Sequence, residues 1–209
     1  MGEKTLRKAL IFFGGWKGHE PKLIADKISE ELRNKDYSIT KSSDFGDLLD
    51  DELLTYDVII PIWSCGMKGD FYLSQLLNAV KNGVGLATFH GGINWFEQEK
   101  YYEMIGAFYL YDSKPEKYNV TIADTNHPIT EDLQDIEIIS EKYYIQVDPK
   151  NHILAYADFS ETKMPISWIK NYGKGRVFYS SLAHSPEQIF NQMNMKMILN
   201  GIDWASKVI

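Results

Sequence analysis

Three histidines follow apolar runs of this 209-residue chain, and they are the side chains best suited to chemistry. They lie in the segments Gly14-Gly15-Trp16-Lys17-Gly18-His19-Glu20, His90-Gly91-Gly92 and Ser180-Ser181-Leu182-Ala183-His184. Imidazole exchanges protons near neutral pH and is the commonest side-chain ligand for metal ions. The neighbouring glycines would give a substrate close access to the main chain. We therefore predict that His19, His90 and His184 act in one site.

Carboxylates near these histidines would complete an acid–base site. Glu20 follows His19 directly, and Glu141 opens the segment Glu141-Lys142-Tyr143-Tyr144. A carboxylate and an imidazole can share the transfer of a proton to or from a substrate. We predict that catalysis is carried by His19, His90, His184, Glu20 and Glu141.

A purely structural role remains open for each of these features. His90 stands where a strand turns into a helix, a position that often presents a nucleophile but also suits a buried histidine that caps the helix. Glycine pairs can serve only to let the chain turn. The first loop matches neither G-x-G-x-x-G nor a phosphate-binding Gly-Lys-Ser/Thr, so nucleotide binding is not predicted.

A divalent metal such as zinc is a second possibility for the three histidines. Three protein ligands and one water form the usual catalytic zinc site. The ligands would be His19, His90 and His184, although no H-E-x-x-H spacing supports such a site. The sequence leaves metal binding as an alternative to chemistry without a metal.

Strands and helices alternate along the chain and would position these segments. Apolar runs at 8–13, 56–63 and 85–89 are typical of strands buried on both faces of a parallel sheet. Helical spacing predicts helices from Pro21 onward and over 71–80, 94–105 and roughly 186–205. The inner face of the last helix is expected to carry Phe190, Met193, Met197, Ile198 and Ile202. This pattern predicts a doubly wound α/β fold with a mostly parallel sheet. Ligands of such folds bind beyond the carboxyl ends of the strands, where the histidine segments would lie.

One domain is expected over residues 1–209, with a β-rich insertion at about 107–157. The insertion contains short β-like runs at 118–122 and 136–139, separated by turn residues. After it, runs at 166–169 and 176–179 flank a tight turn and predict a hairpin.

The composition and charge of the chain limit which binding partners and which cellular compartment are expected. The formal net charge is -7 and no Lys/Arg run forms a stripe, so nucleic acid is not expected as a partner. No apolar stretch approaches the roughly 20 residues that cross a bilayer, and the apolar run near the N-terminus is too short for a signal peptide. Cys65 is the only cysteine, which excludes an internal disulfide and fits the cytoplasm. A possible homodimer face would use Phe108, Tyr109, Tyr111 and Trp204.

As an ordered set, the motifs of this chain resemble the ThuA-like family, which is named for trehalose utilisation and is related in fold to class I glutamine amidotransferases. The matching segments are Gly15-Trp-Lys-Gly-His-Glu20, Phe89-His-Gly-Gly92, His127-Pro-Ile-Thr130, Glu141-Lys-Tyr143, Pro165-Ile-Ser-Trp168, and Tyr172-Gly-Lys-Gly-Arg176 through to His184. The resemblance implies a flavodoxin-like sheet and a role in the metabolism of trehalose or a related glycoside or keto-glycoside.

The resemblance also suggests how a sugar would be held. Aromatic rings suit the apolar faces of a sugar, and Trp16, Trp63, Trp95 and Tyr143 are expected near the cleft. We predict that substrate is bound by Gly15, Trp16, Trp63, Gly91, Gly92 and Tyr143. The amidotransferase relatives carry a cysteine where this chain has His90, and Cys65 lies on another loop, so glutamine hydrolysis is not expected. A non-catalytic sugar-binding or sensing protein is the alternative, because the same aromatics and glycines would serve it.

Overall fold

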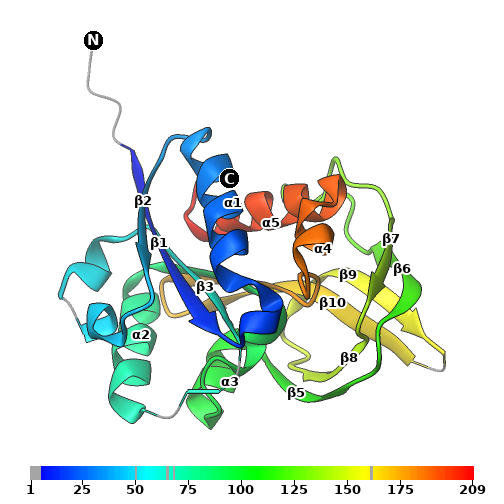
Figure 1. Cartoon of the computed structure of the whole chain (residues 1–209), viewed down its shortest axis with the longest axis horizontal. Coiled ribbons are helices and arrows are strands. Elements are labelled where there is room, and N and C mark those ends of the chain that lie inside the picture. The colour runs from blue at the N-terminus through cyan, green and yellow to red at the C-terminus, as the bar shows by residue number, and fades with distance from the viewer. Residues whose placement is uncertain (1–5, 50, 65, 68, 161) are drawn as a thin grey trace.

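A nine-stranded sheet forms the centre of the protein in the computed structural model, which describes residues 6–49, 51–64, 66–67, 69–160 and 162–209 (Figure 1). The order of its strands is β2-β1-β3-β4-β11-β10-β9-β6-β7, and a second sheet pairs β5 with β8. The strands are β1 (Arg7–Gly15), β2 (Tyr37–Ser42), β3 (Val58–Ser64), β4 (Gly85–Phe89), β5 (Ala107–Asp112), β6 (Glu116–Ile122), β7 (Ile136–Ser140), β8 (Tyr143–Val147), β9 (His152–Phe159), β10 (Thr162–Tyr172) and β11 (Gly175–Ser180).

The first half of the large sheet is parallel. β1 pairs in parallel with β2 and β3, while β4 pairs in parallel with β3 and β11. β3, β4, β11 and the centre of β1 are almost wholly buried, as expected for strands covered on both faces, whereas the edge strand β2 is largely polar and more exposed. Because β1, β3, β4 and β11 run in one direction, the connections that leave them emerge at the same edge.

Helices lie on both sides of this parallel half (Figure 1). On one side α1 contacts α4 and α5, and α5 packs on β11 and β4; on the other side α2 contacts α3. Each longer helix turns an apolar stripe toward the sheet, with Ile24, Ile28 and Leu32 as the stripe of α1. The helices are α1 (Pro21–Arg33), α2 (Asp70–Asn82), α3 (Glu99–Ile105), α4 (Pro186–Phe190) and α5 (Gln192–Ala205).

The second half of the sheet is antiparallel. β10 and β11 form the predicted hairpin, with Tyr172 opposite Gly175 next to the turn, and β9, β6 and β7 continue the sheet. Residues 107–157 supply β5 to β8 and most of β9. The α/β class predicted from the sequence is confirmed, and the sheet is mixed because this segment extends it with antiparallel strands.

Two predicted helices differ from those observed. The helix expected over 94–105 begins only at Glu99, because the main chain at Trp95 accepts a hydrogen bond from the Met67 N–H and Phe96 forms a parallel bridge with Met67. The helix expected over 186–205 is two helices. Asn191 interrupts it with ψ 126° and accepts hydrogen bonds from the next two N–H groups of α5.

The break at Asn191 also changes which face of the last helices is buried. Phe190, which was expected on the inner face, is 45% exposed because it lies just before the break. Met197, Ile198 and Ile202 of α5 are buried as predicted.

Two further sequence predictions concern membrane-spanning helices and a homodimer face. Among the described residues, the structure has no helix long and apolar enough to cross a membrane. Of the residues expected at a homodimer face, Phe108 and Tyr111 are exposed on β5, Tyr109 donates to the Asp112 carboxylate, and Trp204 lies under the Arg176 guanidinium. Cys65 lies outside the described residues.

Candidate active site

Three histidine rings meet at the carboxyl edge of the parallel strands. His19 follows β1, His90 follows β4 and His184 follows β11. Nε2 of His90 lies 3.3 Å from Nε2 of His19 and 3.2 Å from Nδ1 of His184. One ring nitrogen from each histidine lies within 4.8 Å of those of the other two. The fold therefore brings together three side chains that are far apart in the sequence.

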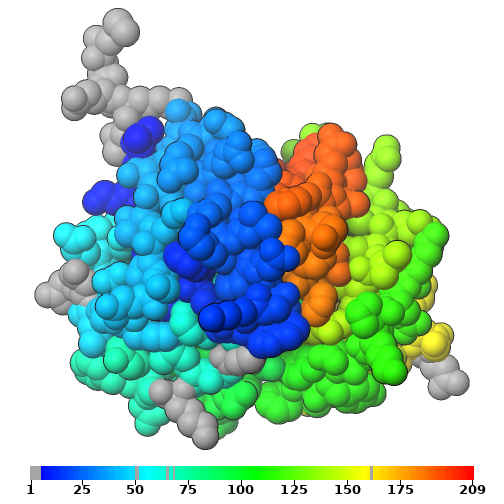
Figure 2. All heavy atoms as spheres, viewed as in Figure 1, coloured from blue at the N-terminus to red at the C-terminus, as the bar shows by residue number. Residues whose placement is uncertain are grey.

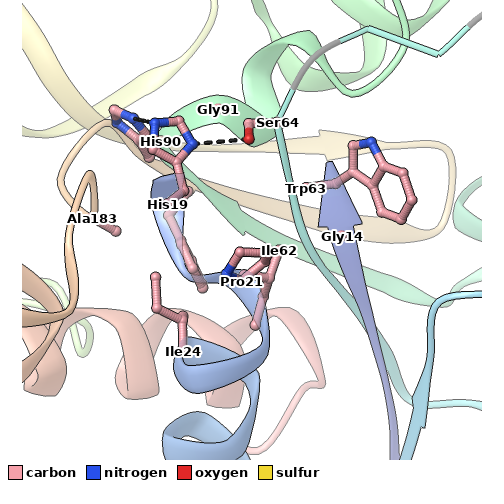
Figure 3. Close-up of a pocket in the computed structure, with 11 residues that line it drawn as sticks. Gly14, His19, Pro21, Ile24, Ile62, Trp63, Ser64, His90, Gly91 and Ala183 are labelled. Atoms are coloured by element: carbon pink, nitrogen blue, oxygen red, sulfur yellow. Dashed lines mark hydrogen bonds between the residues drawn. The ribbon is translucent and has the colours of Figure 1, made fainter. Parts of the chain in front are cut away.

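The far nitrogens of two of these rings have hydrogen-bond partners. Nδ1 of His90 lies 3.3 Å from the Ser181 carbonyl oxygen, and Nδ1 of His19 lies 2.8 Å from the Ser64 hydroxyl (Figure 3). A carbonyl oxygen only accepts, so Nδ1 of His90 carries the proton and Nε2 of the neutral ring presents a lone pair. Metal-binding histidines are held in this way by a partner on the nitrogen away from the metal.

The surroundings keep the rings of His19 and His90 neutral. Burial, together with the positive charge of His184, lowers the pKa of His19 from 6.5 to about 4. Burial lowers the pKa of His90 well below its ordinary value, and charges on His19 and His184 lower it further. Both rings therefore remain uncharged at neutral pH, which is the state that binds a metal ion or accepts a proton.

Glu141, in the β7–β8 connection, and Tyr143, the first residue of β8, complete the cluster. Oε2 of Glu141 lies 3.1 Å from Nδ1 of His184 and 4.0 Å from Nε2 of His90. The Tyr143 hydroxyl lies 2.9 Å from Nε2 of His90, and the two rings stack with centroids 4.6 Å apart. Burial raises the pKa of Glu141, whereas the charge of His184 opposes this rise. A carboxyl group with a raised pKa is suited to transferring protons near neutral pH.

Glu20 lies apart from this cluster. It is exposed at the N-terminal end of α1, where its backbone takes the left-handed conformation with φ 48°. Of the two carboxylates predicted for catalysis, only Glu141 contacts the histidines within the described part of the chain.

The glycines beside the histidines are needed for packing around Ser64. A Cβ on Gly15 would lie 2.0 Å from the Ser64 carbonyl oxygen, and a Cβ on Gly91 would lie 2.5 Å from Cβ of Ser64. Gly92 packs as closely, since its Cβ would lie 1.9 Å from Oγ1 of Thr88. These contacts explain the glycines without a substrate, and their predicted part in substrate binding stays a prediction.

The tryptophans predicted near the cleft differ in position. Trp16 is 53% exposed, and its ring lies edge-on to His19 with centroids 4.6 Å apart. Trp63 lines the same hollow as the histidines, but its ring stacks on Phe12 and points away from them (Figure 3). Trp95 is fully buried in the core, so the expectation that it faces the cleft is wrong.

The hollow between His19 and His90 is small. Its volume is about 20 Å³, and its wall includes the apolar side chains of Ile24 and Ile62 as well as the polar Ser64. This volume holds about one water molecule. A ligand larger than a water molecule would therefore have to approach from the outer side of the cluster, where the side chains of His184 and Glu141 are 22% and 19% exposed.

Several contributing residues were missed by sequence reasoning. Ser64 ends β3 and Ser181 directly follows β11, so a search for polar residues at every strand end would have found both. Tyr179 lies within β11, yet its hydroxyl donates to the His90 carbonyl at 2.9 Å. Gln188 accepts a hydrogen bond from the His184 main-chain N–H and donates one to the Ile139 carbonyl. No local sequence pattern indicated this role.

The geometry allows two kinds of chemistry. With no metal, His90 Nε2 accepts from Tyr143 and Glu141 accepts from His184, which forms an acid–base network. With a metal, the three ring nitrogens would act as ligands. Zn–N bonds of 2.0–2.1 Å place tetrahedral ligands about 3.3 Å apart, close to the 3.3 and 3.2 Å separations measured from His90 Nε2.

Comparison with known proteins identifies relatives of this fold. A ThuA-like protein of Bacteroides uniformis superposes with a TM-score of 0.83 at 17% identity, covering 98% of this chain and 93% of that chain. A ThuA-like protein of Parabacteroides merdae gives 0.76 at 16% identity, covering 98% and 91%. A β-galactosidase from Bacillus circulans sp. alkalophilus gives 0.66 at 11% identity, covering 98% of this chain and 31% of that one.

The sequence itself gives the family. No curated protein matched the chain. The sequence model of the ThuA family, described as "Trehalose utilisation", matches residues 8–205. Since this match covers nearly the whole chain, the protein belongs to the ThuA family.

Proposed function

We propose that this ThuA-family protein is an enzyme that acts on trehalose or a related glycoside or keto-glycoside by His/Glu acid–base chemistry. The observation that carries this proposal is the convergence of His19, His90, His184 and Glu141 from separate connections onto one partly exposed cluster. A purely structural role does not require several titratable groups with shifted pKa values at one edge of the sheet.

We also propose that the three histidines hold a divalent metal ion, with zinc as the favoured ion. The two nitrogen separations of 3.3 and 3.2 Å from His90 Nε2, the neutral rings of His19 and His90, and the partners on the outer nitrogens of these two rings support it. The ion would polarise a substrate oxygen or make a bound water more acidic. Glu141, next to the ligand nitrogen of His184, would then move the proton.

Trp16 supports a carbohydrate as the substrate. Its exposed ring beside His19 offers a face for stacking on the apolar side of a sugar. The family's description as "Trehalose utilisation" gives the substrate class. The substrate would be bound with Trp16 on one side and Glu141 and Tyr143 on the other.

The proposal includes an amidotransferase-like scaffold without amidotransferase chemistry. The strand order β2-β1-β3-β4-β11 and the helices on both sides support a flavodoxin-like arrangement. His90 stands at the turn after β4 with φ 46°, where the amidotransferase relatives would carry a nucleophilic cysteine. Imidazole does not replace a thiolate as the acyl carrier in that chemistry.

Metal content tests the proposed metal site. Protein purified without a histidine tag and incubated with Zn²⁺ is desalted and analysed for metal by mass spectrometry. We expect about one zinc per chain for the wild type and little for His90→Asn. Asparagine tolerates the left-handed backbone of residue 90 and keeps a donor for the Ser181 carbonyl. Equal zinc content in both proteins would refute binding by this cluster.

Turnover tests the proposed enzymatic activity. Trehalose and its keto derivative are incubated with the wild type, Glu141→Gln and the control Glu137→Gln, which changes an exposed glutamate on β7, and the products are analysed by NMR. We expect wild-type rates for the control and a loss of at least about 100-fold for Glu141→Gln. Saturable sugar binding with no chemical change in the wild type would instead establish a non-catalytic sugar-binding protein.

A further inference from the structure

We propose that Gln188 is a positioning residue that sets the distance between Glu141 and His184. Its importance for activity rests on the proposed function, but its structural effect can be tested without substrate or metal. Gln188 lies on α4 and its side chain is buried, with 7% of the residue exposed. It touches neither imidazole directly, so it would act through the segments that carry the reactive groups.

The amide of Gln188 joins two segments from different parts of the fold. Its Oε1 accepts the His184 main-chain N–H at 2.8 Å and the Ser140 hydroxyl at 3.2 Å. Its Nε2 donates to the Ile139 carbonyl at 2.8 Å. Ser140 directly precedes Glu141 in the sequence. One side chain thus connects the end of β7 to the main chain at His184.

These contacts need both ends of an amide. Oε1 meets two donors and Nε2 meets a carbonyl oxygen, so an inverted amide would place an N–H group against the His184 N–H. A glutamate has the same shape but no donor for the Ile139 carbonyl. An apolar side chain would leave the buried Ser140 hydroxyl and the Ile139 carbonyl without this partner.

Glu141 depends on such support because of its place in the sheet. It follows β7, the last strand of the large sheet, so within the described ranges no further strand pairs with the outer side of β7. α4 packs beside β7, and Figure 2 shows α4 in orange next to the green strands on one face of the protein. The Tyr118 hydroxyl anchors the Glu141 carbonyl from the sheet side at 3.3 Å. Gln188 provides the corresponding anchor from α4.

The contact between Glu141 and His184 can be tested directly by NMR spectroscopy of the metal-free protein. Oε2 of Glu141 is 3.1 Å from Nδ1 of His184, so this contact favours the ring form with the proton on Nδ1. Long-range ¹H–¹⁵N spectra of histidine-labelled protein, recorded at one pH with chelator present, distinguish the two forms. We expect His184 to be protonated on Nδ1 in the wild type and to shift toward the Nε2 form in Gln188→Met.

Two other variants make the result specific. Gln188→Glu keeps the size and one acceptor, so it provides a folded comparison if the methionine variant unfolds, and we expect the same shift in the same direction. Gln192→Glu is the control, because Gln192 is an exposed glutamine at the start of α5. Its His184 spectrum should match that of the wild type.

Zinc affinity, measured by competition with a chromogenic chelator, gives the functional readout. Loss of a supporting partner of a metal ligand typically weakens affinity about 10- to 100-fold, and we expect a loss of this size in Gln188→Met and Gln188→Glu. Failure of wild-type protein to bind zinc would refute the metal site, while the spectra would still test Gln188. Folded Gln188 variants with wild-type His184 spectra would overturn the positioning role.

Discussion

Mild acid should destabilise the metal-free protein through its buried histidines. His19 and His90 both have lowered pKa values in the fold, the first at about 4. In the unfolded chain each would titrate near 6.5. As the pH falls below 6.5, the unfolded chain therefore takes up protons that the folded protein does not. Stability is fully present above pH 6.5 and is lost as the pH falls toward the folded pKa values.

The size of this loss follows from the shifts. Between pH 7.5 and pH 5 an unfolded histidine gains nearly one proton, which corresponds to about 2 kcal/mol for a group that stays neutral in the fold. His90 is buried and should contribute about this amount, whereas His19 is partly exposed and is discounted to about 1 kcal/mol. Glu141 acts in the opposite direction, because its raised pKa adds stability as the pH falls. The net loss should be about 3 kcal/mol or slightly less.

Other groups with shifted pKa values do not obscure the effect of His19 and His90 between pH 7.5 and pH 5. His127 has a lowered pKa and acts in the same direction, but it is half exposed. The carboxylates with lowered pKa values stabilise the fold while they are ionised. This stabilisation is lost only as the pH falls below their pKa values in the unfolded chain, which lie below pH 5. These carboxylates are Asp26, Asp124, Asp148 and Glu187.

Urea unfolding of chelator-treated protein at pH 7.5, 6.5, 5.5 and 5 measures the effect. With a slope of about 2 kcal/mol per molar urea, a loss of 3 kcal/mol lowers the midpoint by about 1.5 M. His90→Asn removes the larger contribution, so its midpoint should fall by only about 0.5 M over the same range. A wild-type midpoint that does not change with pH, or an equal fall in His90→Asn, would refute this account of the site's electrostatics.

Three further substitutions test the packing and the contacts of the site. Gly92→Ala places a Cβ 1.9 Å from the buried Thr88 hydroxyl, so we expect a loss of about 1–3 kcal/mol in urea unfolding; unchanged stability would contradict the close packing. Gly18→Ala places a Cβ 2.4 Å from the Trp16 ring, and the displaced ring should weaken sugar binding severalfold by calorimetry without changing zinc content. Tyr143→Phe removes the hydroxyl that lies 2.9 Å from His90 Nε2. We expect kcat to fall about 100-fold while the melting temperature stays nearly unchanged. A kcat equal to that of the wild type would exclude a role for the hydroxyl.

Local sequence patterns were sufficient to predict most of the strands and helices. The buried runs at 8–13 and 85–89 became β1 and β4, and Pro21 begins α1 as expected for a proline at the first helical position. Patterns failed where a distant contact or a side-chain cap decided the backbone. The Met67 N–H holds Trp95 outside a helix, and the Asn191 side chain begins α5 afresh.

The sequence by itself determined the family and which side chains could do chemistry, because motif residues such as His19, His90 and His184 stand at the ends of recognisable strands. Only the tertiary structure decided which carboxylate joins them. Glu20 is adjacent to His19 in sequence but is exposed on α1, whereas Glu141 reaches His184 from the far end of the sheet. The physical reason is that strand order and packing, which sequence spacing does not encode, set the distances between side chains from separate connections.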